Sequence, residues 1–193
     1  MAATLSTMPP LGSPAPDFTL PDYKGLERSL EDFSAAPALL MIFMCNHCPY
    51  VQHVRGEIVR VAADYQPRGL AVVAINANDA ERFPEDDIDK MKEYARTYNY
   101  TFPYLYDESQ ETAKAYQAAC TPDFFLYDKE RKLYYRGRLD DSRPGSDIPV
   151  TGANLREALE KVLADRPAPD RQKPSVGCNI KWRPGNEPPY FEK

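Results

Sequence analysis

The sequence predicts an α/β fold in which helices flank a central mixed sheet. Two apolar runs, residues 38–44 and 70–76, have the length and composition of strands that are buried on both faces of a sheet. A helical pattern separates them, and a strand, a helix and a strand in that order form a right-handed crossover with parallel strands. Residues 124–139 predict an antiparallel hairpin, which makes the sheet mixed.

The helix between the two runs is predicted by one apolar stripe at helical spacing, which Pro67 and Gly69 end. The members of this stripe are Val51, Val54, Ile58, Val61, Ala62 and Tyr65. A second helix is predicted to open at Pro84 and the acids 85–87, because proline fits a first turn and acids favour its positive end. Its apolar residues are Ile88, Met91, Ala95 and Tyr98.

Shorter elements complete the domain. Residues 101–106 predict a strand and residues 111–118 a short helix, and the strands of the hairpin lie at 124–127 and 133–139. A last helix ends before Pro167 and carries an apolar stripe of Leu155, Ala158, Leu159, Val162 and Leu163.

The length of 193 residues predicts one domain with extended ends. We expect an N-terminal arm at 1–11, a compact domain at 12–165 and a proline-rich tail at 166–193, which holds six of the 19 prolines. Alternate tail residues are apolar, so an extended chain would dock with all of them on one side and with Trp182 as its anchor. These residues are Val176, Cys178, Ile180 and Trp182.

Composition excludes several classes of function. A net charge of −5 without a basic stripe argues against nucleic acid as a partner. No apolar stretch approaches the ~20 residues of a membrane span, and residues 1–16 lack the pattern of a secretory signal. We therefore expect no membrane association and a cytoplasmic location, where cysteines more often serve catalysis or metal binding than structural disulfides.

The motif Cys45-Asn46-His47-Cys48 lies between the first predicted strand and the first predicted helix. The unpaired amides and the dipole at a helix N-terminus favour a thiolate there. We expect Cys45 to attack a substrate disulfide and Cys48 to resolve the mixed disulfide. His47 adds a nearby donor or positive charge that stabilises the reduced pair.

Two other interpretations of the motif remain open. Cys45, Cys48 and His47 could bind zinc or copper(I), although their spacing is not that of a familiar zinc module, and His53 is expected to be an ordinary helix residue. The fold could also be an interaction module whose dithiol no longer reacts. We expect neither a bound metal nor another cofactor.

Thr121-Pro122 directly precedes a predicted strand, where proline fits only at the strand's start or in a cis peptide. Such a loop can face the dithiol and leave its backbone free for a bound polypeptide. Cys120 beside it and Cys178 in the tail are candidates for additional redox partners. The competing interpretations are a small buried residue at Cys120 and a docking contact at Cys178.

Several segments together resemble the redoxin group of the thioredoxin superfamily. They are Gly12 to Asp22, Ser29-Leu30, the dithiol after a buried strand, and Thr121 to Leu126. The group comprises alkyl hydroperoxide reductases and thiol-specific antioxidant proteins, and the likeness is greatest to peroxiredoxin-like members with a thioredoxin-type dithiol. It covers residues 12–165 and implies a thioredoxin fold with an N-terminal hairpin, an insertion around residues 79–105 and a cis peptide before Pro122.

The sequence departs from the peroxiredoxin pattern of this group. Peroxiredoxins place a proline seven residues and a threonine three residues before the cysteine that reacts with peroxide. For Cys45 these positions hold Ala38 and Ile42, and for Cys48 they hold Met41 and Cys45. A peroxidase is therefore the alternative to a disulfide oxidoreductase.

The sequence also departs from ordinary thioredoxins, which carry a tryptophan where this chain has Met44 and a buried aspartate where it has Leu39. The histidine before the second cysteine is instead similar to that of protein disulfide isomerases. We conclude that the chain is a thiol-disulfide oxidoreductase. It acts on protein or small-thiol disulfides and is reduced by an electron donor that the sequence does not identify.

Overall fold

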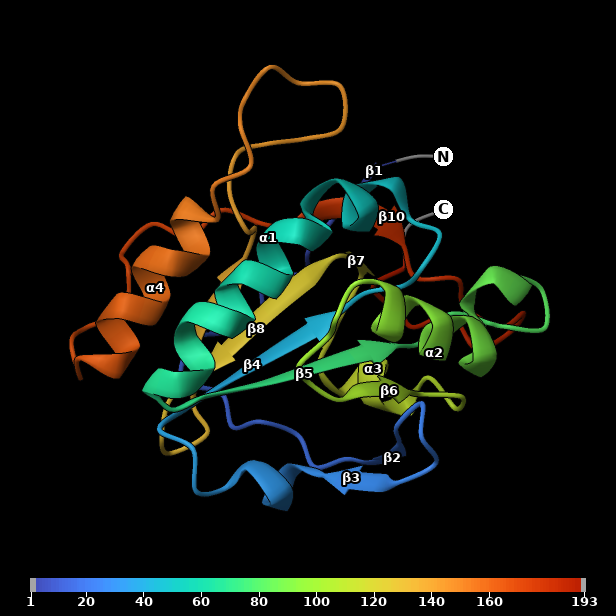
Figure 1. Ribbon diagram of the computed structural model, residues 1–193, viewed down its shortest axis with the longest axis horizontal. Coiled ribbons are helices and arrows are strands. Elements are labelled where there is room, and N and C mark those ends of the chain that lie inside the picture. Colours follow the sequence, from blue (N-terminus) through green and yellow to red (C-terminus); the bar gives the residue numbers. More distant parts are fainter. Residues whose placement is uncertain (1–2, 192–193) are drawn as a thin grey trace.

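The computed structural model describes residues 3–191. Its centre is a five-stranded sheet in the order β6-β5-β4-β8-β9 (Figure 1). The strands β4 (Ala38–Phe43), β5 (Leu70–Asn76) and β6 (Tyr104–Tyr106) are parallel, whereas β8 (Asp123–Tyr127) and β9 (Leu133–Gly137) add an antiparallel hairpin. This is the mixed sheet of a thioredoxin fold, so the predicted fold class is confirmed.

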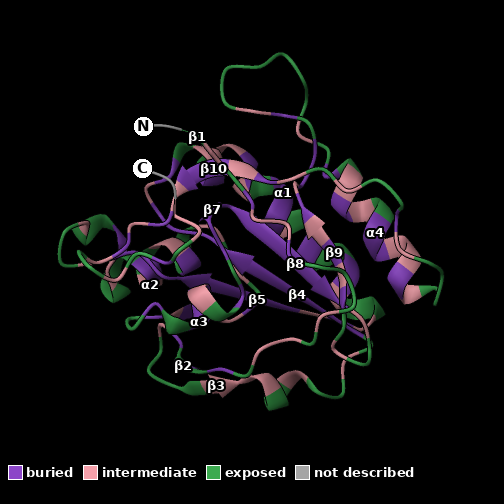
Figure 2. Cartoon of the chain, turned by 180° about the vertical axis from the view of Figure 1, so that it is seen from behind, coloured by how far each residue is buried: buried purple, intermediate pink, exposed green. Residues whose placement is uncertain are grey.

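Helices cover both faces of the sheet. On one face lie α1 (Pro49–Tyr65), α2 (Ile88–Thr97) and α4 (Ala153–Leu163), and on the other lies α3 (Glu111–Ala115) (Figures 1 and 2). Every residue of β4 is buried, and alternate residues enter separate cores because successive side chains of a strand point to opposite faces. β4, the strand that leads into the dithiol, is therefore the central strand of the sheet and is buried on both faces.

The N-terminal hairpin implied by the family resemblance is present as β2 (Thr19–Pro21) and β3 (Glu27–Ser29). A short 3-10 helix, η1 (Leu30–Phe33), follows it. Phe18 and Leu20 are buried from this segment and join the core that contains α3.

The predicted second helix begins later than the sequence suggested. Pro84–Asp86 forms a separate 3-10 turn, η3, and the helix α2 starts at Ile88 with Asp87 as its N-cap. The Asp87 carboxylate accepts the N–H of Lys90 at 2.7 Å, which satisfies one of the free amides of the first turn. The preceding carboxylate, Asp86, is fully buried and has other partners.

Smaller boundaries also differ from the expectations. The strand predicted at 101–106 is β6, which starts at Tyr104, and the helix predicted at 111–118 ends at Ala115, because Gln117 has a positive φ of 55°. The strand predicted at 133–139 ends at Gly137, where a β-carbon would lie 2.2 Å from the carbonyl oxygen of Lys173.

The two ends of the chain meet in a second small sheet of order β1-β10-β7. In it β10 (Val176–Asn179) pairs antiparallel with both β1 (Ala3–Leu5) and β7 (Cys120–Thr121). The tail is therefore docked against β1 and β7. No helix among residues 3–191 has the length and apolar character needed to cross a bilayer.

The prediction that four alternating tail residues share one side is wrong. Cys178 joins the core beneath α1, whereas Ile180 and Trp182 join the opposite core, and Val176 is only half-buried. The strand ends at Asn179, between Cys178 and Ile180, so the alternation on which the prediction depended does not continue past this residue.

Candidate active site

The dithiol lies where β4 leads into α1. The N–H of Met44 still bonds the carbonyl of Ile75 in the neighbouring strand, and Cys48 is the N-cap of α1 with Pro49 in its first turn. The positive end of the helix dipole is thus at Cys48. Both sulphurs are free thiols, and both residues are buried.

The loop at Thr121 and Pro122 packs directly on the dithiol. The Cys45 Sγ lies 3.6 Å from the Thr121 hydroxyl, and the Cys48 thiol donates to the Thr121 carbonyl at 3.1 Å. The peptide between Thr121 and Pro122 is cis, as the family resemblance implied. The structure therefore brings together Cys45, Cys48, Thr121 and Pro122.

The two sulphurs have different electrostatic environments. Hydrogen bonds from Cys178 and from Cys45 lower the pKa of Cys48, and the N–H of Val51 adds to this effect. Burial, with the bond to Cys48 and the charge of Asp86, raises the pKa of Cys45. The surroundings therefore lower the pKa of Cys48 relative to that of Cys45.

Asp86 is a site residue that the sequence did not reveal. Its buried carboxylate accepts the Nδ1–H of His47 at 2.7 Å and the backbone N–H of Asn46 at 2.8 Å. The hydrogen bond to Asp86 is also the main reason why the pKa of His47 is raised. Asp86 therefore fixes both the loop inside the dithiol motif and the charge of its histidine.

Further amides hold Asp86 in place. Asn78 donates to the carboxylate at 2.7 Å, and Asn76 donates to the backbone carbonyl of Asp86 at 2.7 Å. In the sequence, Asp86 stands among Glu85 and Asp87 after a proline, where all three acids fit a helix start equally well. Only the folded structure distinguishes Asp86, because it brings this residue next to the loop of the dithiol motif.

His47 is otherwise held by an aromatic contact. Its ring stacks on Phe83 with 5.7 Å between centroids and an interplanar angle of 7°.

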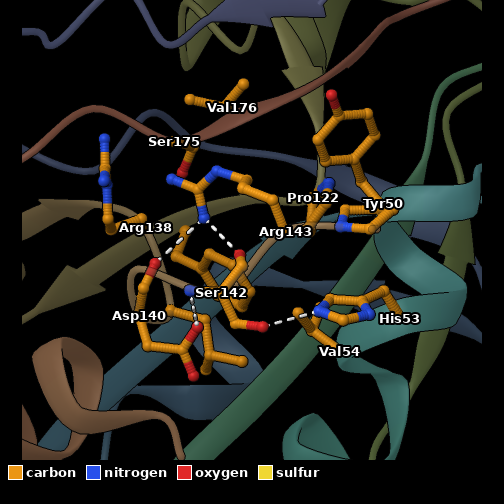
Figure 3. Close-up of a pocket in the computed structure, with 13 residues that line it drawn as sticks. Tyr50, His53, Val54, Pro122, Arg138, Asp140, Ser142, Arg143, Ser175 and Val176 are labelled. Carbon is orange, nitrogen blue, oxygen red and sulfur yellow. Dashed lines mark hydrogen bonds between the residues drawn. The ribbon is translucent and has the colours of Figure 1, made fainter. Parts of the chain in front are cut away.

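His53, in contrast, bonds the hydroxyl of Ser142 at 2.7 Å and belongs to a small pocket beside Pro122 (Figure 3). Tyr50 and Arg143 line the same pocket.

The backbone beside Pro122 is not free, contrary to expectation. The strand β10 pairs with β7 there, with Cys178 opposite Thr121 and Asn179 opposite Cys120. This pairing places Cys178 near Cys48, in the same core. The tail thus occupies the edge at which a polypeptide was expected to bind.

Cys120 has surroundings typical of a packing residue. It is fully buried, and its sulphur lies 3.9 Å from the carbonyl oxygen of Pro122. Within residues 3–191, no hydrogen bond joins Cys120 to either cysteine of the dithiol. Its redox role stays a prediction, and the contacts favour packing.

One group of side chains has the geometry of a metal site. Cys45, His47 and Asp86 each offer a ligand atom, and these atoms lie within 4.8 Å of one another. The set differs from the one suggested by the sequence, because Asp86 takes the place of Cys48. The Asp86 oxygens and the His47 Nδ1 already bond each other and the neighbouring amides, which competes with a metal.

Residues 11–136 match the model of the AhpC/TSA family. The chain belongs to this family. The two positions at which a peroxidase would carry its threonine hold Ile42 and Cys45, so neither supplies a hydroxyl. The hydroxyl beside Cys45 comes instead from Thr121.

Relatives of this AhpC/TSA member support oxidoreductase chemistry. The chain is 29% identical over 132 residues to the thiol-disulfide oxidoreductase ResA of Geobacillus thermodenitrificans, covering 67% of this chain and 70% of ResA. Together with the family and the dithiol, this identifies the chain as an oxidoreductase that exchanges thiols and disulfides.

Solved structures show that the whole architecture recurs. A crystal structure of an uncharacterized conserved protein from Geobacillus kaustophilus has a TM-score of 0.94 at 54% identity, covering 96% of this chain and 98% of that one. The thioredoxin domain of a thiol-disulfide oxidoreductase from Bacteroides vulgatus has a TM-score of 0.56 at 18% identity, covering 66% and 87%. The second likeness shows the fold alone.

Proposed function

We propose that the protein reduces or exchanges disulfides in extended polypeptide segments, with Cys45 as the attacking thiol and Cys48 as the resolving thiol. The observation that carries the proposal is the placement of the dithiol. It lies at the start of α1, against the backbone of Thr121 and Pro122, whose edge already pairs with an extended strand.

The reaction balances without a cofactor. The Cys45 thiolate attacks one sulphur of the substrate disulfide, that bond breaks, and the released substrate thiolate takes a proton. Cys48 then attacks the Cys45 sulphur, the mixed disulfide breaks, and the second substrate thiol leaves. The substrate gains two electrons and two protons, and the protein is left with a disulfide between Cys45 and Cys48 until an external thiol donor reduces it.

The lower pKa of Cys48 is compatible with attack by Cys45. The two thiols influence each other's pKa, and transfer of the Cys45 proton to Cys48 would leave the thiolate on Cys45. Cys48 lies beneath the Thr121 carbonyl and Cys178, whereas Cys45 faces the Thr121 hydroxyl and the His47 side of the site.

Polypeptides fit the site better than small thiols. An edge strand offers backbone N–H and C=O groups that an extended peptide can pair with, while a small thiol uses none of them. The β7 edge shows that antiparallel pairing is sterically possible directly above Cys48.

Trapping of mixed disulfides tests both the roles and the substrate class. Reduced Cys48→Ser protein is mixed with insulin, and adducts are measured on non-reducing gels. We expect a covalent adduct with Cys48→Ser, none with Cys45→Ser, and a loss of turnover of at least about 100-fold in both, with Cys120→Ser as the matched control.

Two outcomes contradict the proposal. An adduct that forms with Cys45→Ser and not with Cys48→Ser would reverse the roles of the two cysteines. Faster reaction of the wild-type protein with glutathione disulfide than with insulin would show that small thiols are the substrates.

We also propose that the protein acts in the cytoplasm. A dithiol kept reduced by the thiol systems of that compartment can serve as a reductant or an exchanger. Cell fractionation with an antibody tests this, and recovery from an oxidising compartment would contradict it.

A further inference from the structure

The docked tail occupies the position that a substrate polypeptide would need. Its strand β10 pairs antiparallel with β7, next to the cis peptide before Pro122. The residue opposite Thr121 is a cysteine, Cys178, and this residue is buried in the core that contains both cysteines of the dithiol. The tail therefore has the geometry expected of a bound cysteine-containing substrate.

One residue of the loop joins the two cysteines. The Cys48 sulphur lies 3.1 Å from the carbonyl oxygen of Thr121, and Thr121 is the residue that Cys178 faces across the strand pair. The partner of Cys178 in the cluster is thus Cys48. Cys120, on the neighbouring strand, has its sulphur near the carbonyl of Pro122 instead.

Gly177 makes this close approach possible. A β-carbon at this residue would lie 2.0 Å from the carbonyl oxygen of Thr121 and 2.6 Å from its carbon. Real β-carbons do not approach backbone atoms so closely, so only glycine lets the tail lie flat against the loop. The tail can therefore pack against Thr121 only because the residue before Cys178 is a glycine.

We propose that Cys178 is a third redox residue, which receives the oxidised state of the dithiol by forming a disulfide with Cys48. This inference rests on the proposed function, because the disulfide between Cys45 and Cys48 is its starting point. The tail then reacts as an internal substrate of the active site. The disulfide between Cys48 and Cys178 holds it there covalently.

The step is an internal exchange and needs no further oxidant. The Cys178 thiolate attacks the Cys48 sulphur of the disulfide between Cys45 and Cys48. The bond between Cys45 and Cys48 breaks as the bond between Cys48 and Cys178 forms, and the proton lost by Cys178 ends on Cys45. No electrons enter or leave the protein, and Cys45 returns to the thiol form.

The exchange also sets the order of the steps in the catalytic cycle. While a polypeptide occupies the β7 edge, β10 cannot pair there, so Cys178 reaches Cys48 only after the substrate has left. The oxidised protein then holds its tail over the site and excludes a new substrate. A thiol donor that reduces the bond between Cys48 and Cys178 releases the tail for the next cycle.

Disulfide mapping tests the proposal. Reduced protein is oxidised with one equivalent of glutathione disulfide, quenched in acid, alkylated and digested with trypsin for mass spectrometry. Because Cys45 and Cys48 share a tryptic peptide and Cys178 lies in another, a bond to Cys178 links two peptides. We expect these linked peptides in the wild-type protein and in Cys45→Ser, and an internal disulfide within one peptide in Cys178→Ser.

Two variants serve as controls for this mapping. Cys120→Ser makes the same chemical change on the strand that pairs with β10 and should leave the linked peptides unchanged. Gly177→Val keeps all four cysteines but displaces the tail, so we expect at least a tenfold loss of linked peptides with the disulfide between Cys45 and Cys48 retained. If Gly177→Val does not fold, the maps of the wild-type protein and of Cys178→Ser decide.

The possible failures can be told apart. An internal disulfide in the wild-type protein, together with free Cys48 and Cys178 in oxidised Cys45→Ser, would overturn the role of Cys178 and leave the proposed function standing. Linked peptides that persist in Gly177→Val would show that docking of the tail does not direct the exchange. If neither the wild-type protein nor Cys178→Ser forms any disulfide, the proposed function itself is wrong.

Discussion

At the scale of single residues, Asp86 connects the insertion to the dithiol loop. One of its oxygens accepts hydrogen bonds from the backbone N–H groups of Asn46 and His47, at 2.8 Å and 3.3 Å. The other oxygen accepts a hydrogen bond from Nδ1 of the His47 ring at 2.7 Å. The same carboxylate is thus an acceptor for the backbone of the loop and for the His47 ring. It acts through His47 and the loop, and is a positioning residue.

Replacing Asp86 should lower the pKa of His47. In Asp86→Asn the charged hydrogen-bond partner is lost, so the pKa measured by NMR titration of the ring protons should fall toward its ordinary value. The folded-state pKa of His47 is raised, so its contribution to stability is complete at low pH and disappears as the pH rises through that pKa. We therefore expect Asp86→Asn to lower the free energy of unfolding by about 1–3 kcal/mol at pH 6. The loss should be smaller at pH 9.

The neighbouring residue provides a matched control for this prediction. Asp87→Asn removes an equal charge one residue away, and asparagine still caps α2. It should leave the His47 titration where it is in the wild-type protein. A His47 pKa that does not move in Asp86→Asn would show that the contact with Asp86 does not set it.

At the scale of elements, the tail is held by its last turn as well as by β10. Trp182 is buried against the core on the α3 side and meets the ring of Tyr190 edge-on, with 6.5 Å between centroids. The strand above the dithiol and this aromatic anchor lie on opposite cores, so the tail is fixed on both sides of Asn179.

Truncating the anchor should loosen the tail. We expect Trp182→Ala to destabilise the protein by about 3 kcal/mol and to increase the rate at which iodoacetamide alkylates Cys178 by at least tenfold. Leu5→Ala in β1 is the control, because this exposed side chain belongs to the same small sheet but buries little surface. Unchanged alkylation in Trp182→Ala would mean that β10 holds the tail without its anchor.

At the scale of the whole molecule, Asp123 lies where the central sheet, the arm and the tail meet. Burial raises the pKa of this carboxyl to about 7, although the N–H of Ala119, 3.4 Å from one of its oxygens, acts in the other direction. Ser6 of the N-terminal arm and Ser175 of the tail lie near it and are joined by a backbone hydrogen bond of 3.0 Å, so ionisation of Asp123 affects the junction of all three parts.

This carboxyl should make the stability of the protein fall as the pH rises. An acid with a raised folded-state pKa keeps its proton in the native state between its ordinary pKa and about pH 7, while the unfolded chain releases it. The free energy of unfolding should therefore decline across this interval by up to about 1.4 kcal/mol per pH unit. Urea unfolding of Asp123→Asn should show a shallower decline between pH 5 and pH 8.

An exposed acid serves as the control for the pH series. Asp89→Asn on α2 should reproduce the wild-type decline, because its carboxyl is exposed to solvent in the folded protein. Equal slopes in Asp123→Asn and the wild-type protein would show that other groups cause the pH dependence.

The sequence by itself determined the order of the main elements and the chemistry of the dithiol. Continuous apolar runs predict β4 and β5, one apolar stripe predicts α1, and two cysteines between them predict a thiol at a helix N-terminus, because these signals depend only on local periodicity and spacing. The tertiary structure alone decided that Asp86 reaches His47, that β10 covers the edge beside Pro122 and that Cys178 meets Cys48. These contacts join residues far apart in the chain, and their distances depend on how loops and tail fold back over the sheet, which no local pattern records.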